Sequence, residues 1–178
     1  MHKKSLLKIA LLTGVISIAP VTTYAETYLT ASQAQKIIWE SAAMTPFEVE
    51  LTSAQRKSIK KASTVRVNSK KIKGWRTQDG GWFIVDSVIG KHENIDIAVG
   101  ITKEGKVKGV EILTYRETYG SEVRAAKWLS QFFGKDHSEV LKLDKHIKNI
   151  SGATLSCRHV TDGVNRLMHS WDQVLRYL

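Results

Sequence analysis

The 178 residues suffice for one ordinary domain with a hydrophobic core and are too few for two full-sized domains. Hydrophobic residues make up 42% of the chain and are spread along it, which excludes a disordered protein. The formal net charge of +10 suits an anionic partner, but charge alone does not separate nucleic acid, anionic lipid and an acidic protein.

Residues 1–25 have the pattern of a secretory signal peptide. Three lysines precede an apolar run at residues 9–19, and Thr23-Tyr24-Ala25 is typical of a cleavage site. An uncleaved anchor is the alternative, although the run is short for a membrane span. We therefore expect a periplasmic or otherwise extracytoplasmic protein that begins at Glu26. Removing three lysines and no acids lowers the net charge from +10 to +7, and export makes nucleic acid the least expected partner.

Two helical patterns follow, and we expect them to form a small N-terminal helical segment over residues 26–63. The first begins at Thr30, where apolar residues start to recur at helical spacing, and continues to about Met44 before Pro46 ends it. The second covers residues 52–62, with a Thr or Ser cap and a very polar surface.

From residue 64 onward, β-branched and aromatic residues dominate and predict an antiparallel meander. The expected strands are residues 64–67, 73–76, 82–89, 95–101 and 107–115. Helical spacing returns at residues 121–133, which Gly134 ends, and again beyond Gly152 to the end of the chain. The fold class is therefore α+β, with a central antiparallel sheet flanked by helices in a domain over residues 64–178.

Small and hydroxyl-bearing residues gather where the loop before the last helix ends, in Ile-Ser-Gly-Ala-Thr-Leu-Ser at residues 150–156. Free backbone N–H groups and the positive end of the helix dipole stabilise an anion at such a junction. A simple helix cap is the alternative, because Ser or Thr before a helix usually does no more than cap it. The residues alone leave both interpretations open.

The same stretch resembles the flavinylation motif of the FMN-binding domain family. This family includes the flavin-bearing subunits of the sodium-pumping NADH:quinone reductase and of the Rnf complex, together with small exported relatives. In it, a flavin transferase moves the FMN half of FAD onto the motif threonine and leaves a phosphoester. The resemblance implies that Thr154 carries the FMN. The residues expected around its phosphate and ribityl chain are Ser151, Gly152, Ala153, Leu155 and Ser156.

Two further stretches support the resemblance, which spans about residues 81–167. Residues 117–120, Glu-Thr-Tyr-Gly, are similar to the family's Glu-Thr-Pro-Gly loop, and residues 88–92 are typical of the small exported members. The further cofactor-binding residues that the resemblance implies are Glu117, Thr118, Gly120 and Lys91. One departure is Lys148, where the family usually has an aspartate three residues before the motif serine.

The resemblance implies an exported electron-transfer flavoprotein rather than an enzyme with its own substrate. Its expected partners are a flavin transferase, a membrane-bound electron donor and an acceptor. Tyr115, Tyr119 and Trp128 are candidates to stack near the flavin ring. The alternative is a non-catalytic binding module of the same fold with non-covalent flavin or none.

Other chemistry has little support in the sequence. There is no Gly-x-Ser-x-Gly elbow, and Ser151, His159 and Asp162 on one short segment do not make a credible triad. His159 and His169 are ten residues apart, which is not the spacing of a metal pair. We expect Cys157, the only cysteine, to be a small apolar filler on a helix.

Overall fold

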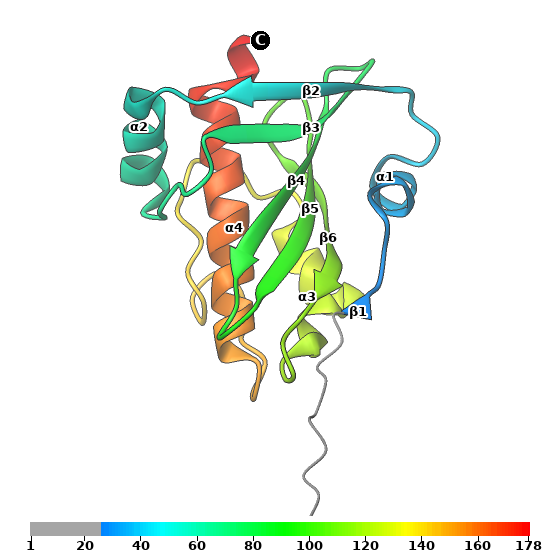
Figure 1. Cartoon of the computed structure of the whole chain (residues 1–178), viewed down its shortest axis with the longest axis vertical. Coiled ribbons are helices and arrows are strands. Elements are labelled where there is room, and N and C mark those ends of the chain that lie inside the picture. Colours follow the sequence, from blue (N-terminus) through cyan, green and yellow to red (C-terminus); the bar gives the residue numbers. More distant parts are fainter. Residues whose placement is uncertain (1–25) are drawn as a thin grey trace, which may run out of the picture.

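The fold is a six-stranded antiparallel sheet with helices on both faces, as the sequence predicts (Figure 1). The computed structural model describes residues 26–178, and the expected signal segment, residues 1–25, lies outside the described residues. The strand order is β1-β6-β5-β4-β3-β2. In chain order the strands are β1 (Glu26–Thr27), β2 (Met44–Glu50), β3 (Lys71–Thr77), β4 (Trp82–Ile89), β5 (Asn94–Ile101) and β6 (Val107–Tyr115).

The predicted meander from β3 to β6 is confirmed, but the region before it differs from the expectation. Residues 64–67 form no strand, because Thr64 takes the left-handed conformation that ends the preceding helix. Residues 44–50 form β2 instead of leading out of a helix. Pro46 fits there because β2 is an edge strand, so the missing N–H interrupts no ladder on its outer side.

The helices are α1 (Ala31–Trp39), α2 (Ser53–Ser63), α3 (Ala126–Leu129) and α4 (Thr154–Gln173), with 3₁₀ turns η1 (Ser121–Arg124), η2 (Ser130–Phe132) and η3 (Leu175–Tyr177). The predictions for α2 and α4 are confirmed. Helix α1 ends at Trp39, earlier than expected, since Glu40 leaves the helical region with φ 54°. The single helix expected over residues 121–133 is instead three short pieces, because the extended Ala125 separates η1 from α3.

Helix α4 fixes the geometry of the molecule. It lies along one face of the sheet and α1 lies on the other (Figure 1). The helix approaches the sheet closely at Gly163, where a Cβ would stand 2.6 Å from Val88 Cγ1. Helix α2 packs on the outer side of α4, where the Ser58 hydroxyl and the Gln173 side chain are hydrogen bonded at 2.7 Å. Buried on two sides, α4 holds its N-terminal end beside the β4–β5 hairpin turn.

Candidate functional site

A pocket of about 570 Å³ opens at the N-terminal end of α4. Three segments that are far apart in the sequence form its walls: the turn after β4, the loop after β6 and the first turn of α4. The lining residues are Lys91, His92, Glu117, Thr118, Tyr119, Gly152, Ala153, Thr154, Leu155 and Ser156. The pocket therefore joins the three stretches that the sequence singled out.

The Glu117 side chain ties the loop after β6 to the turn after β4. Its Oε1 accepts the backbone N–H groups of His92 at 2.5 Å and Glu93 at 3.0 Å. Partial burial works to raise the pKa of this carboxyl, but backbone hydrogen bonds from Glu93, His92 and Lys91 outweigh burial and hold the pKa below its ordinary value. Glu117 is therefore a charged structural link between two walls of the pocket.

Tyr115 fixes the other end of the same loop. Its hydroxyl donates to the Tyr119 carbonyl oxygen at 2.5 Å and lies 2.7 Å from Ser156 Oγ on α4. Burial raises the pKa of the Tyr115 phenol, so this hydroxyl stays protonated and able to donate. Gly120 passes beneath with φ 94°, and a Cβ there would stand 2.7 Å from the Tyr115 hydroxyl. These contacts fix the backbone of the loop after β6. The Tyr119 side chain lines the pocket and is 82% exposed.

The first turn of α4 presents unused backbone donors. Within residues 26–178, no side chain caps this end of the helix. The N–H groups of Thr154, Leu155 and Ser156 begin the helix, and intrahelical bonding starts with the Cys157 N–H to the Ala153 carbonyl oxygen at 2.9 Å. Gly152 precedes them with φ 85° and open space where a Cβ would be. This is the geometry of an anion site.

The hydroxyl of Thr154 lies within this first turn and is held by one neighbour. Asn149 Nδ2 donates to Thr154 Oγ1 at 3.0 Å. The Asn149 Oδ1 atom is buried and has no hydrogen-bond partner among the described residues. Thr154 itself is partly exposed. A polar side chain with an unsatisfied buried atom thus stands beside a hydroxyl that solvent and ligands can reach.

The loop leading into α4 is anchored at Lys148 through its backbone. The Trp128 indole Nε1 donates to the Lys148 carbonyl oxygen at 2.7 Å, and the Lys148 N–H donates to Gln131 Oε1 at 2.7 Å. The Lys148 side chain is exposed and does not line the pocket. The conformation of this loop therefore does not depend on the charge at position 148.

Eight of the ten residues singled out by sequence line the pocket. The other two are Gly120, which is buried behind the lining against Tyr115 and Ser156, and Ser151, which is exposed in the turn before α4. The lining also includes His92, from the stretch at residues 88–92, and Tyr119, one of the three candidates for stacking on the flavin. Asn149 was missed altogether, because it lies before the motif and no sequence pattern pairs it with Thr154.

Of the three aromatic candidates, only Tyr119 has its ring free at the pocket. Tyr115 and Trp128 are buried, and their polar atoms already have partners. Tyr119 lines the pocket and has a mostly exposed ring. The structure thereby narrows the choice of a stacking residue to one.

Other candidate groups lie apart from this pocket. Cys157 is fully buried, and burial raises the pKa of its thiol. Among residues 26–178, no group of three or more His, Cys, Asp or Glu side chains is placed to hold a metal ion. In that same range, no helix is both long and apolar enough to cross a membrane.

A second hollow, of about 470 Å³, lies between β3, β4 and α4. It contains Asp86 and Arg166, which pair with each other at 2.6 Å.

Comparison with known proteins agrees with the position of the pocket. Residues 90–169 match the model of the FMN-binding domain family, a span that contains all ten residues that line the pocket. The chain is also 32% identical over 80 residues to a subunit of the Na(+)-translocating ferredoxin:NAD(+) oxidoreductase complex of Acetobacterium woodii. That alignment covers 40% of this chain and 39% of the relative, so the chain spans about two fifths of the relative's length. Residues 90–169 of this chain are therefore similar to an FMN-binding domain, and both comparisons support FMN as its cofactor.

Proposed function

We propose that this protein is an exported electron carrier that holds FMN through a phosphoester to Thr154. The observation that carries the proposal is the position of the Thr154 hydroxyl. It lies at an uncapped helix N-terminus, inside a pocket formed by all three motif stretches. The match of residues 90–169 to the FMN-binding domain family supports FMN as the ligand.

The pocket fits a phosphate with an attached flavin. Uncapped N–H groups and the helix dipole suit the phosphate, and the open space at Gly152 admits it close to the backbone. A volume of about 570 Å³ lies within the range of small-molecule and cofactor pockets. Asn149 Nδ2, which donates to Thr154 Oγ1, holds the acceptor hydroxyl in place at the pocket.

Attachment follows from the chemistry of Thr154. The Thr154 oxygen forms a bond to the phosphorus of the FMN half of FAD, and the pyrophosphate P–O bond breaks so that AMP leaves. A flavin transferase supplies the base that takes the hydroxyl proton. Asn149 orients the hydroxyl, and the first N–H groups of α4 stabilise the negative charge of the resulting phosphodiester.

The remaining lining residues hold and tune the cofactor. When bound, FMN supplies reversible one- or two-electron chemistry. Tyr119 offers an exposed ring for stacking, and Lys91 brings a positive charge to the pocket wall. Glu117 and Tyr115 keep that wall in place through the backbone bonds described above.

Export and partners complete the proposal. The basic start, apolar run and Thr23-Tyr24-Ala25 pattern of residues 1–25 favour secretion and a mature chain from Glu26. An ester bond keeps the cofactor on a protein that has no flavin pool around it. A relative that is a subunit of an oxidoreductase complex supports redox partners at a membrane. N-terminal sequencing of the native protein tests export, and recovery of Met1 from the cytosol would contradict it.

Intact mass spectrometry tests the attachment site directly. Protein co-expressed with a competent flavin transferase should gain the mass of one FMN less water and stay yellow after denaturation and desalting. Thr154→Val removes the only proposed acceptor and should abolish the adduct. Thr118→Val, in a threonine that lines the same pocket, is the matched control and should keep it. Ser151→Ala should reduce attachment less than Thr154→Val does.

Two results would contradict the covalent proposal. An unchanged FMN adduct on Thr154→Val would mean that another residue is the acceptor. If wild-type protein stays unmodified when it is co-expressed with an active transferase, the covalent proposal is wrong. The alternative, a non-catalytic binding module with non-covalent flavin or none, would then replace it. Titration of that unmodified protein with FMN would then separate these two forms.

A further inference from the structure

The positive charge of this protein is concentrated in one part of the fold. Residues 51–78 contain nine basic side chains and no acidic one. The other residues from 26 to 178 carry 15 basic and 17 acidic side chains, so they are close to neutral. The excess charge therefore belongs to α2, the loop after it and β3, and not to the domain as a whole.

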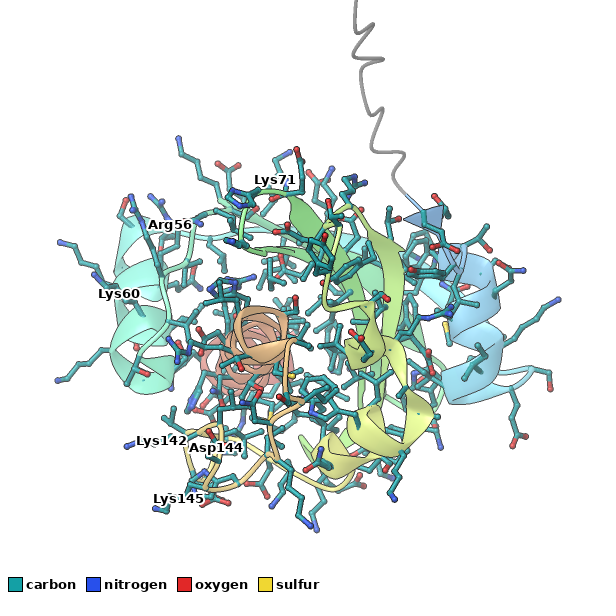
Figure 2. All side chains as sticks on the ribbon, turned by 90° about the horizontal axis from the view of Figure 1, so that it is seen from below. Arg56, Lys60, Lys71, Lys142, Asp144 and Lys145 are labelled. Carbon is teal, nitrogen blue, oxygen red and sulfur yellow. The ribbon has the colours of Figure 1, made fainter. Side chains whose placement is uncertain are left out.

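Helix α2 carries the densest part of this charge. Four cations, Arg56, Lys57, Lys60 and Lys61, lie within its eleven residues, and we call them the α2 basic face. Ile59 is buried toward α4, whereas the three lysines are exposed. Figure 2 shows Arg56 and Lys60 at the edge of the molecule. Packing therefore accounts for Ile59 but not for the lysines opposite it.

Nothing within the described residues neutralises the α2 basic face. None of its four cations forms an ion pair there, whereas Lys71 and Lys73 on β3 both pair with Glu48. Like charges three and four positions apart on a helix repel one another. The helix dipole favours Lys60 and Lys61 in the last turn, but it does not favour Arg56 and Lys57. An anionic partner would relieve this repulsion.

We propose that the α2 basic face docks on an anionic phospholipid surface. The face lacks what a protein partner needs at its centre, because no large apolar side chain of residues 51–78 is exposed. Its cations are mostly lysines, which act on lipid phosphates as point charges near the surface. The residues that surround them, such as Ser53, Ala54 and Ser58, are small, so the ammonium groups meet no bulky obstruction.

Docking in this way leaves the flavin pocket free. Ser58 on α2 contacts Gln173 near the end of α4, nineteen residues from Thr154. That is about 28 Å along a helix that rises about 1.5 Å per residue. A redox partner thus reaches the pocket while α2 rests on the lipid. The lipid proposal itself does not depend on FMN, so it is testable on protein with or without flavin.

Vesicle sedimentation tests the proposal with the protein as purified from the producing cells. Wild type should bind vesicles of equal parts phosphatidylglycerol and phosphatidylcholine, bind those of phosphatidylcholine alone far less, and lose the difference at high salt. The triple variant K57Q/K60Q/K61Q should lose about 100-fold in partition, since each lysine near such a surface contributes about 1 kcal/mol. Glutamine keeps the helix propensity close to that of lysine, and circular dichroism checks the fold.

The matched control K36Q/K103Q/K127Q removes the same charge from exposed lysines on other elements. It should lose much less binding than the α2 variant. All variants share the same N-terminal residues, so any contribution of that segment cancels in the comparison. Equal losses in the two triple variants, or no preference of wild type for phosphatidylglycerol, would overturn the proposal. Retention on polyglutamate, lost in K57Q/K60Q/K61Q, without vesicle binding would mean an acidic protein partner instead.

Discussion

The two loops that face each other across the pocket differ in how the residues next to the pocket are held. In the loop after β6, Glu117 accepts backbone N–H groups, Tyr115 holds the Tyr119 carbonyl, and Gly120 is packed tightly beneath. In the loop before α4, Gly152 faces open space and the helix that follows has no side-chain cap. The loop after β6 has its hydrogen bonds satisfied within the protein. The first N–H groups of α4 have no side-chain acceptor, so a bound ligand can accept from them.

A matched pair of glycine substitutions should separate the two loops most strongly. Both Gly120 and Gly152 have positive φ, so alanine costs about 1 kcal/mol or more at either position. At Gly120 the new Cβ also collides with the Tyr115 hydroxyl and Ser156 Oγ, which raises the expected loss in the free energy of unfolding to about 3 kcal/mol. Urea unfolding of the two variants measures the difference. Equal losses would mean that the Gly120 contact relaxes and that the loop after β6 is not rigid.

The exposed ring of Tyr119 provides the next test of the loop after β6. A phenol ring stacked on the flavin quenches its fluorescence, so Tyr119→Leu in flavin-loaded protein should raise the emission. The affinity of unmodified protein for FMN should fall by about 1 kcal/mol, the scale of an aromatic stacking pair. Tyr177→Leu is the control, since Tyr177 is 74% exposed near the C-terminus and outside the pocket. Equal emission from wild type and Tyr119→Leu would exclude stacking.

The pKa of Glu117 predicts a smaller, pH-dependent effect. The folded-state pKa is held below the ordinary value, so the stabilising contribution of the carboxylate is complete above that value. It is lost as the pH falls through the folded pKa. Glu117→Gln should therefore lower the Tm near neutral pH, and the gap to wild type should close on acidification. Glu122→Gln, which removes a charge from an exposed glutamate of η1 outside the pocket, is the control and should lower the Tm near neutral pH less than Glu117→Gln does. A gap that widens in acid would contradict the assignment.

Lys148 should have the smallest effect, because its side chain lies outside the pocket and its backbone is held by Trp128 and Gln131. Under the proposed function, position 148 could either contact the transferase or compensate the charge of the bound phosphate. A side chain outside the pocket fits the first role better. Lys148→Asp should then raise the initial rate of flavin attachment by less than tenfold, since an exposed charge contact is worth about 1 kcal/mol or less. Paired labelling rates and a redox titration measure this. An unchanged rate with a lower reduction potential would favour the compensation hypothesis.

How far the sequence predicts the molecule depends on whether a feature is local. The meander, α2 and α4 follow from periodicity and turn residues, and the structure confirms them. Strand β2 was missed because Pro46 usually breaks structure, and only its place at the sheet edge makes it tolerable. The break at Ala125 was missed because the apolar spacing continues across it.

The pocket follows the same division. The motif residues 151–156 are contiguous, so a resemblance identifies them as a group. Asn149 contacts Thr154, and Tyr115 contacts Ser156. No spacing in the sequence predicts either contact. The one free ring among three aromatic residues is likewise a matter of burial, which the sequence pattern does not resolve.

The hydrogen bond between Tyr115 and Ser156 joins residues 41 positions apart. Together with the turn after β4, it makes a pocket that an unfolded chain does not possess, although the acceptor motif itself is a short contiguous peptide. Under the proposed function, cofactor loading therefore reports on folding. A transferase that requires the assembled pocket would modify native protein and pass over misfolded chains, so the fraction that is yellow would measure the fraction that reached its final structure.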